Sequence, residues 1–104
     1  MTPAYRVIIL PEAFDDIDKI VEHIAKDSRQ NAAAMIDRLY AACLSLGTFP
    51  RRYKVYRSSK NPSYVVHSMP VPPFIIYYRV MEHPQTVRIL TVRHCARRQP
   101  KRFS

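Results

Sequence analysis

Glycine is nearly missing from this chain of 104 residues, which has one glycine against nine prolines. Most turns must therefore form without the residue that adopts positive φ at the lowest cost, and low-complexity linkers and collagen are excluded. Long apolar runs are missing as well, since no segment has the roughly 18 consecutive apolar residues of a membrane-spanning helix. The first residues lack a basic region followed by an apolar stretch. We expect a cytoplasmic protein.

Cysteine is also scarce. Cys43 and Cys95 lie far apart and form no CxxC pair, so the sequence predicts no disulfide framework and no zinc knuckle. The histidines show neither HxH nor HExxH spacing; they are His23, His67, His83 and His94. We therefore predict no metal site and no cofactor.

Acidic residues are scarce in one half only. Residues 1–50 hold five basic and seven acidic side chains, whereas residues 51–104 hold twelve basic side chains and one acid, Glu82. The chain carries a formal net charge of +9, to which the first half contributes −2 and the second half +11. Such an imbalance favours an anionic partner that meets the C-terminal half, although a basic tail can also serve only to keep a small protein in solution.

The first half has two kinds of apolar pattern. Residues 5–10 form a short β-branched run that predicts a largely buried strand. From Pro11 to Ala25, apolar residues recur at steps of three and four, which predicts an amphipathic helix whose acids, Asp16 among them, lie on the outer side. A second helical pattern runs from about Gln30 to Leu46 and ends at Gly47. The short link between the two helices predicts an antiparallel helical hairpin, with exposed apolar surface at one edge.

The second half reads as strands at 53–57, 64–69, 74–81 and 86–93, separated by the proline-containing segments 61–62, 70–73 and 83–84. The last two strands should pair as a hairpin. Tyr77 and Tyr78 should point to opposite faces, one into the core and one outward. The whole predicts one α+β domain over 1–104: an N-terminal strand, then an antiparallel helical hairpin packed on a twisted, mostly antiparallel β-sheet, with a basic and partly flexible tail at 95–104.

Four segments, in this order, carry a resemblance to a known family: YRVIILPEAFDDIDKIVEHIAKDS, AAAMIDRLYAACLSLGTFP, IIYYRV and VRILTVRHCARR. Together they resemble the ParE/RelE superfamily of toxins from bacterial type II toxin-antitoxin modules. The resemblance extends from Tyr5 to about Pro100. It departs from the family's pattern at 68–73, where a turn with glycine is more usual.

The closing motif favours the ParE-like branch. ParE-like members end the last strand with a hydrophobic residue, a histidine, a small residue and arginine, which resembles the segment 92–98 here. RelE-like ribonucleases more often have a tyrosine there, and no tyrosine follows Tyr78. The ParE resemblance implies a plasmid-stabilisation toxin that inhibits DNA gyrase by binding and is neutralised by a ParD-like antitoxin. Two alternatives stay open: a RelE-like endoribonuclease that cleaves mRNA at the ribosome, and an inactive homologue that only binds its antitoxin.

The basic residues of the second half supply the site residues that we expect. Target-binding candidates are Arg93, His94, Arg97 and Arg98; antitoxin-binding candidates are Arg51, Arg52, Lys54 and Arg57. In the RelE-like alternative, Arg57, Arg79 and Arg93 would hold phosphate and His94 would move a proton. Arginine stabilises charge but hardly releases its proton, so RNA cleavage needs a second acid or base, with Tyr77, Tyr78 and Lys54 as distant candidates. For His94 itself, the sequence favours a structural role at the strand end over a catalytic one.

Overall fold

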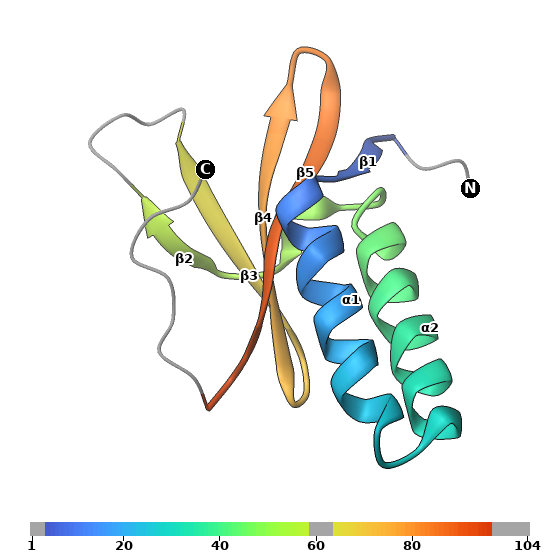
Figure 1. Ribbon diagram of the computed structural model, residues 1–104. Coiled ribbons are helices and arrows are strands. Elements are labelled where there is room, and N and C mark those ends of the chain that lie inside the picture. The colour runs from blue at the N-terminus through green and yellow to red at the C-terminus, as the bar shows by residue number, and fades with distance from the viewer. Residues whose placement is uncertain (1–3, 59–63, 97–104) are drawn as a thin grey trace.

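The computed structural model describes residues 4–58 and 64–96, which form two layers. A five-stranded sheet has two antiparallel helices on one face (Figure 1). The elements, in chain order, are β1 (Arg6–Ile9), α1 (Pro11–Ala25), α2 (Arg29–Ser45), the 3-10 turn η1 (Pro50–Arg52), β2 (Val55–Ser58), β3 (Val65–Val71), β4 (Phe74–Glu82) and β5 (Gln85–His94). The strand order is β1-β5-β4-β3-β2, with β1 parallel to β5 and the other pairs antiparallel. The predicted α+β architecture is confirmed.

The two helices form where the apolar periodicity predicts them. Pro11 is the first residue of α1, where its fixed φ suits the helix and its missing N–H costs nothing. The Ser28 side chain caps α2 by accepting a hydrogen bond from the Asn31 N–H at 3.1 Å. Phe14 and Leu44 keep 43% and 64% of their surface exposed, in agreement with the apolar edge expected on the hairpin. Among the residues that the structure describes, no helix is long and apolar enough to span a membrane.

The first strand differs from its prediction. β1 lies at the edge of the sheet, paired only with residues 86–89 of β5, and its side chains alternate between exposed and half-buried. Ile8 is 38% exposed. The expectation of a largely buried strand was therefore wrong, because an apolar run of four residues does not reveal whether its strand lies in the centre or at the edge.

Gly47 is not the residue that takes the left-handed conformation after α2. That conformation belongs to Phe49, with φ of 47°, and no glycine among the described residues has positive φ. Gly47 is buried, and its carbonyl oxygen accepts a hydrogen bond from the Tyr5 N–H at 3.0 Å. The single glycine thus allows the chain before β1 to approach closely, while Phe49 carries the backbone strain.

The turn between β3 and β4 is tighter than the segment 70–73 suggested. Pro70 is part of β3, opposite Ile75, and only Pro72 and Pro73 make the turn. Pro70 lies beyond the stretch of β3 that pairs with β2, so its missing N–H interrupts no ladder there. Arg38 of α2 donates a hydrogen bond to the Pro72 carbonyl at 3.0 Å, which ties the helical layer to this turn. The predicted turn at 61–62 lies outside the described residues.

The sheet is buried on both faces. The main core joins the helices to one face and includes Ile17, Leu39, Ile76, Tyr78 and Ile89. A smaller cluster of Val66, Tyr77 and Leu90 covers the other face. Tyr77 and Tyr78 do belong to opposite faces, but both are fully buried, so the prediction that one is exposed was wrong. Tyr77 packs with Val66 and Leu90 in this second cluster and against the Tyr56 ring, whose centroid is 4.7 Å away.

Candidate binding surfaces

The end of β5 is shaped by a bulge. Tyr77 pairs with Thr91 and Tyr78 with Ile89, so Leu90 is an extra residue in β5. β1 pairs with β5 only as far as Ile89, which leaves the edge of β5 uncovered beyond that point. α1 lies beside β5 in Figure 1, and the two elements are in contact.

Asp16 of α1 replaces a strand partner at that edge. Its Oδ2 atom accepts a hydrogen bond from the Val92 N–H at 3.0 Å and another from the Thr91 hydroxyl. Arg93 Nε in turn donates to Thr91 Oγ1 at 3.2 Å, so Asp16 positions Arg93 through Thr91. The expectation that Asp16 lies on the outer face of the helix was wrong, because helical periodicity does not show that a strand edge with an unpaired N–H lies beside it.

A cleft of about 440 Å³ lies between α1 and the end of β5. Its polar lining comes from Asp16, Lys19 and His23 of α1 and from Arg93 and His94 of β5. Two predicted target-binding residues, the sequence neighbours Arg93 and His94, thus line the cleft, while the other two, Arg97 and Arg98, lie outside the described residues. Sequence reasoning missed Lys19 and His23, whose only signal was their spacing of three and seven residues from Asp16 on one helix face.

His94 is held by backbone and ring contacts. Its Nδ1 atom accepts a hydrogen bond from the Ala96 N–H at 3.0 Å, and its ring meets Phe74 edge-on, with centroids 5.4 Å apart. Since Nδ1 is an acceptor, the neutral ring carries its proton on Nε2. The half-buried ring lines the cleft.

Arg52 lies at the other end of the helical layer and bonds to the end of α2. Its Nη1 donates to the carbonyl oxygens of Ser45 and Phe49 at 3.3 and 3.2 Å, and also to that of Thr48. Its Nη2 donates to Ser45 Oγ at 3.1 Å. A cation at a helix C-terminus satisfies carbonyls that have no helical partner, and here it also holds Phe49 in its left-handed conformation.

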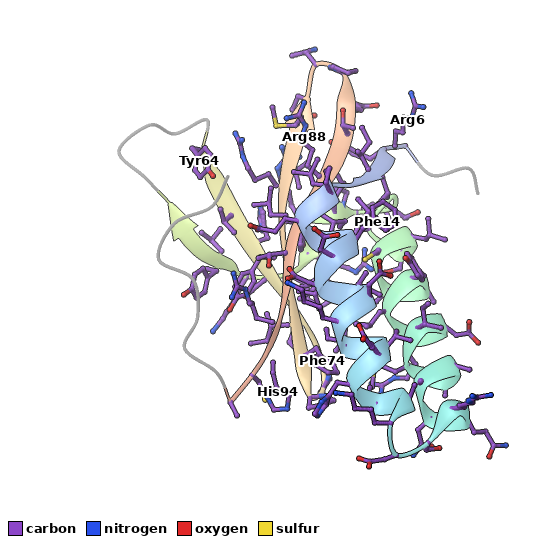
Figure 2. All side chains as sticks on the ribbon, in the orientation of Figure 1. Arg6, Phe14, Tyr64, Phe74, Arg88 and His94 are labelled. Atoms are coloured by element: carbon purple, nitrogen blue, oxygen red, sulfur yellow. The ribbon has the colours of Figure 1, made fainter. Side chains whose placement is uncertain are left out.

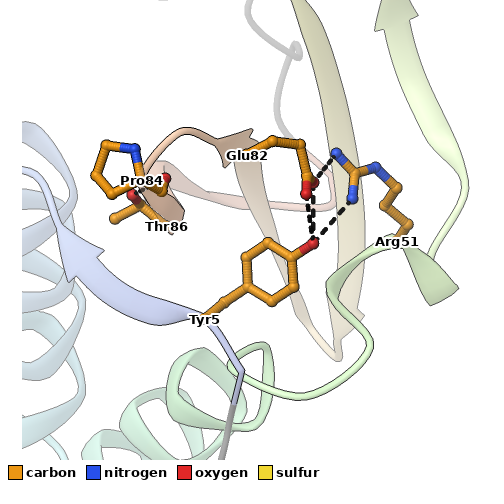
Figure 3. A network of polar contacts seen from close by, with 5 residues as sticks. All are labelled: Tyr5, Arg51, Glu82, Pro84 and Thr86. Carbon is orange, nitrogen blue, oxygen red and sulfur yellow. Dashed lines mark hydrogen bonds and ion pairs between the residues drawn. The ribbon is translucent and has the colours of Figure 1, made fainter.

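Arg51 belongs to a polar network that Figure 3 shows from close by. Its Nη2 lies 2.5 Å from Glu82 Oε2, and the Tyr5 hydroxyl donates to both carboxylate oxygens at 2.9 Å. These hydrogen bonds from Tyr5 and Arg51 lower the pKa of Glu82. Next to the network, a groove of about 660 Å³ is lined by Tyr5, Phe49 and the arginines of η1, and Phe49 is 73% exposed.

The remaining predicted residues lie on or near β2 and β4. The backbone of Arg57, in β2, pairs with Val66 of β3, and the Lys54 carbonyl accepts a hydrogen bond from the Ser68 N–H at 3.1 Å. The Arg79 guanidinium lies over the Tyr64 ring, 4.1 Å from its centroid, on the sheet face away from the helices. This places a cation beside aromatic rings on that face.

Arg79 and His94 do not share a site. His94 lies opposite Phe74, whereas Arg79 is five residues farther along β4, about 17 Å at the usual rise per residue. Arg88, which pairs with Arg79, lies toward the upper end of the sheet in Figure 2, and His94 lies at the lower end. Arg79 and His94, which the RelE-like alternative needs at one phosphate, are therefore far apart along the β4–β5 hairpin.

The two tyrosines considered for proton transfer are buried. Burial raises the pKa of Tyr78 to about 12, and the Tyr78 hydroxyl donates to the Pro50 carbonyl at 2.6 Å. Burial likewise raises the pKa of Tyr77 to about 12. Neither hydroxyl is suited to exchange protons near neutral pH.

Cys43 is buried, and burial raises the pKa of its thiol to about 12. Cys95 is exposed, and neither cysteine is in a disulfide. Across residues 4–58 and 64–96, no three histidine, cysteine, aspartate or glutamate side chains gather as a metal ion would require.

Comparison with known proteins agrees with this architecture. The family model of the ParE toxin of type II toxin-antitoxin system, parDE, matches residues 7–99. The chromosomal ParDE toxin-antitoxin system of P. aeruginosa contains a chain with the same fold, at a TM-score of 0.68 and 18% identity, covering 89% of this chain and 98% of the other. The RelBE2 complex of Mycobacterium tuberculosis contains another, at 0.55 and 20%, covering 88% and 98%. No curated protein matches the sequence. The chain belongs to the ParE toxin family of type II toxin-antitoxin systems.

Proposed function

We propose that this toxin inhibits DNA gyrase by binding it and trapping its cleaved DNA complex, without chemistry of its own. The observation that carries the proposal is the match of the ParE toxin model over residues 7–99. The geometry supports a binding role, because Arg79 and His94 lie about 17 Å apart along the hairpin, too far to act on one phosphate. Arg93 and His94 are the target contacts that we propose on the described part of the chain, with Arg97 and Arg98 beyond it.

The direct test supplies the purified chain to gyrase with relaxed plasmid and ATP. We expect supercoiling to fail and linear, protein-linked DNA to accumulate. A double variant Arg93→Gln/His94→Gln should inhibit less, and Lys26→Gln, which removes an exposed charge elsewhere, should inhibit like the unaltered toxin. Supercoiling that proceeds normally with the unaltered chain would contradict the proposal.

We also propose that a ParD-like antitoxin neutralises the toxin, and that an acidic, amphipathic segment of it binds around η1. Arg51, Arg52, Lys54 and Arg57 are the candidate contacts. The groove beside Phe49 offers apolar surface, and the exposed pair of Arg51 and Glu82 can exchange its carboxylate for one from the partner. Arg52 would contribute mainly by keeping Phe49 in place, since its guanidinium already bonds to carbonyl oxygens.

Co-purification tests the antitoxin contact. The toxin carrying Phe49→Ala or Arg51→Glu should retain less of the co-expressed antitoxin than the unaltered toxin does. Arg88→Glu reverses an equally exposed charge on β5 and serves as the matched control. If the control variant loses as much antitoxin, general charge attraction explains the binding. If the unaltered toxin forms no complex, the proposed antitoxin partner is refuted.

One observation favours a second function. Arg79 over Tyr64 places a cation and aromatic rings on the sheet face away from the helices, which suits stacking on nucleobases. This favours a RelE-like mRNA endoribonuclease. That function predicts RNA fragments when the toxin is added to translating ribosomes, with supercoiling untouched. A chain that leaves both gyrase and translation unaffected, yet still binds its antitoxin, is an inactive homologue.

A further inference from the structure

We propose that the cleft between α1 and the end of β5 is a phosphate-binding site. The inference deepens the proposed function and rests on it in one respect, the identity of the natural ligand as a backbone phosphate of gyrase-bound DNA. The binding of phosphate itself depends only on the residues that line the cleft.

The cleft gathers donors from two walls. Lys19 and His23 are four residues apart on α1, so they lie one turn apart on the same face. Arg93 and His94 line the facing wall at the end of β5. Because the two walls face each other, a ligand between them can accept hydrogen bonds from both at once.

The carboxylate in the cleft is already engaged. Asp16 Oδ2 accepts hydrogen bonds from the Val92 N–H and the Thr91 hydroxyl, which places its charge against donors of the protein itself. Lys19 and Arg93 therefore contribute two positive charges to the cleft, against one carboxylate that already accepts hydrogen bonds from the protein.

The geometry favours a phosphate over a carboxylate as the ligand. A planar carboxylate presents two oxygens in one direction, whereas the tetrahedral oxygens of a phosphate reach donors on opposite walls. The volume of about 440 Å³ exceeds the 30 Å³ or so of a water molecule many times, so the group that carries the phosphate also has room. Ile20, Ile24 and Phe74 supply apolar lining, where water screens the contacts less.

Asp16 is then a positioning residue for the ligand contact made by Arg93. The bond from Arg93 Nε to Thr91 Oγ1 orients the guanidinium group, and the bond from Thr91 to Asp16 fixes the hydroxyl. The η1 region contrasts with this arrangement, since Arg52 there is bonded to main-chain carbonyl oxygens. This difference favours Arg93 over Arg52 as a phosphate ligand.

An NMR titration tests the site directly. Inorganic phosphate is added to the ¹⁵N-labelled full chain at constant ionic strength, with chloride as the reference anion. We expect saturable shifts confined to the amides of 16–24 and 91–96. The absence of saturable shifts, or shifts spread evenly over all basic regions, would overturn the proposal.

Matched variants locate the binding. Lys19→Gln/His23→Gln removes two exposed side chains from the cleft and should raise the Kd for phosphate about fivefold or more. Lys26→Gln/His83→Gln removes the same residue types from exposed positions outside the cleft and should leave the Kd within about twofold. If both double variants lose affinity equally, general charge attraction explains the binding and the site is refuted. Lys19→Gln alone replaces the double variant if the latter unfolds.

Two further arms separate the source of the phosphate from the function. A 12-base-pair duplex without terminal phosphates should shift the same amides if a backbone phosphate fits, whereas shifts with inorganic phosphate only would assign the cleft to a free or terminal phosphate. In the supercoiling assay, Lys19→Gln/His23→Gln should inhibit less than its matched control. If the unaltered toxin leaves gyrase untouched but binds phosphate, the proposed function fails and the phosphate site stands.

Discussion

Arg52 and Arg93 each stand at the end of a secondary-structure element, yet their guanidinium groups have different partners. Arg52 donates to the carbonyl oxygens of Ser45 and Phe49, so its guanidinium group stabilises the end of α2. Arg93 donates through Nε to the Thr91 hydroxyl and lines a cleft beside α1. In a strongly basic chain, the partners of each cation therefore distinguish residues that hold the fold from residues that can bind a ligand.

The largest expected effect comes from removing the carboxylate behind Arg93. Asp16→Ala leaves the Val92 N–H and the Thr91 hydroxyl without their acceptor, so we expect a loss of about 2–3 kcal/mol in the free energy of unfolding. Urea denaturation measures it. Asp18→Ala, an exposed acid on the same helix, should change stability by less than about 0.5 kcal/mol. A similar small change for both variants would mean that the hydrogen bonds of Asp16 do not stabilise the edge of β5.

The next effect tests the structural role of Arg52. Arg52→Ala removes the bonds that satisfy the last carbonyls of α2 and hold the left-handed Phe49, so we expect a loss of about 1–2 kcal/mol by urea denaturation. Lys54→Ala deletes an exposed cation two residues away and should have little effect on stability. Gyrase inhibition by the folded Arg52→Ala protein should stay near that of the unaltered toxin. A loss of inhibition would contradict the proposed difference between Arg52 as a structural residue and Arg93 as a ligand contact.

Arg93→Gln should show the opposite behaviour. We expect stability within about 1 kcal/mol of the unaltered toxin and a fivefold or so rise in the concentration that halves gyrase supercoiling. Arg88→Gln, on the same strand but at the other end of the sheet, should leave inhibition unchanged (Figure 2). If Arg88→Gln weakens inhibition as much, net charge rather than the cleft determines the activity.

The smallest effect concerns Glu82, whose pKa is lowered by hydrogen bonds from Tyr5 and Arg51. A lowered pKa in the folded state stabilises the protein above the ordinary carboxyl pKa, and this contribution disappears as the pH falls through the folded-state value. Glu82→Gln should therefore be slightly less stable than the unaltered toxin at pH 7, with the difference closing between about pH 5 and pH 3. Urea denaturation at both ends of that range measures it, and a difference that persists at pH 3 would exclude the ionised carboxylate as its cause.

Much of the fold could be predicted because the signals are local. Pro11 and the three- and four-residue apolar steps predict α1 over its observed range, and proline marks the turns between strands. The errors arose where a neighbour distant in the sequence decides the outcome. Tyr77 is buried by Val66 and Leu90, and β1 is exposed because it lies at the sheet edge.

The candidate site was predicted only in part. Arg93 and His94 could be named from the closing motif, because that motif is contiguous in the sequence. Lys19 and His23 could not, since α1 shows only an ordinary polar face until β5 is placed beside it. The bonds of Arg52 to the end of α2 were equally invisible, because a basic residue after a helix looks the same whether its charge is exposed to solvent or bonded to carbonyl oxygens.

The sequence by itself determined the order of elements, the helical hairpin, the excess of cations in the second half and the resemblance to the toxin superfamily, since each depends on periodicity, composition or contiguous motifs. Only the tertiary structure decided which cations are bonded within the fold and which line a cleft. The bulge at Leu90 and the end of β1 at Ile9 leave a strand edge open, and Asp16 closes it from α1. Because buried backbone groups need hydrogen-bond partners, the Val92 N–H holds Asp16 of α1 at this edge, and the α1–β5 cleft forms beside that contact.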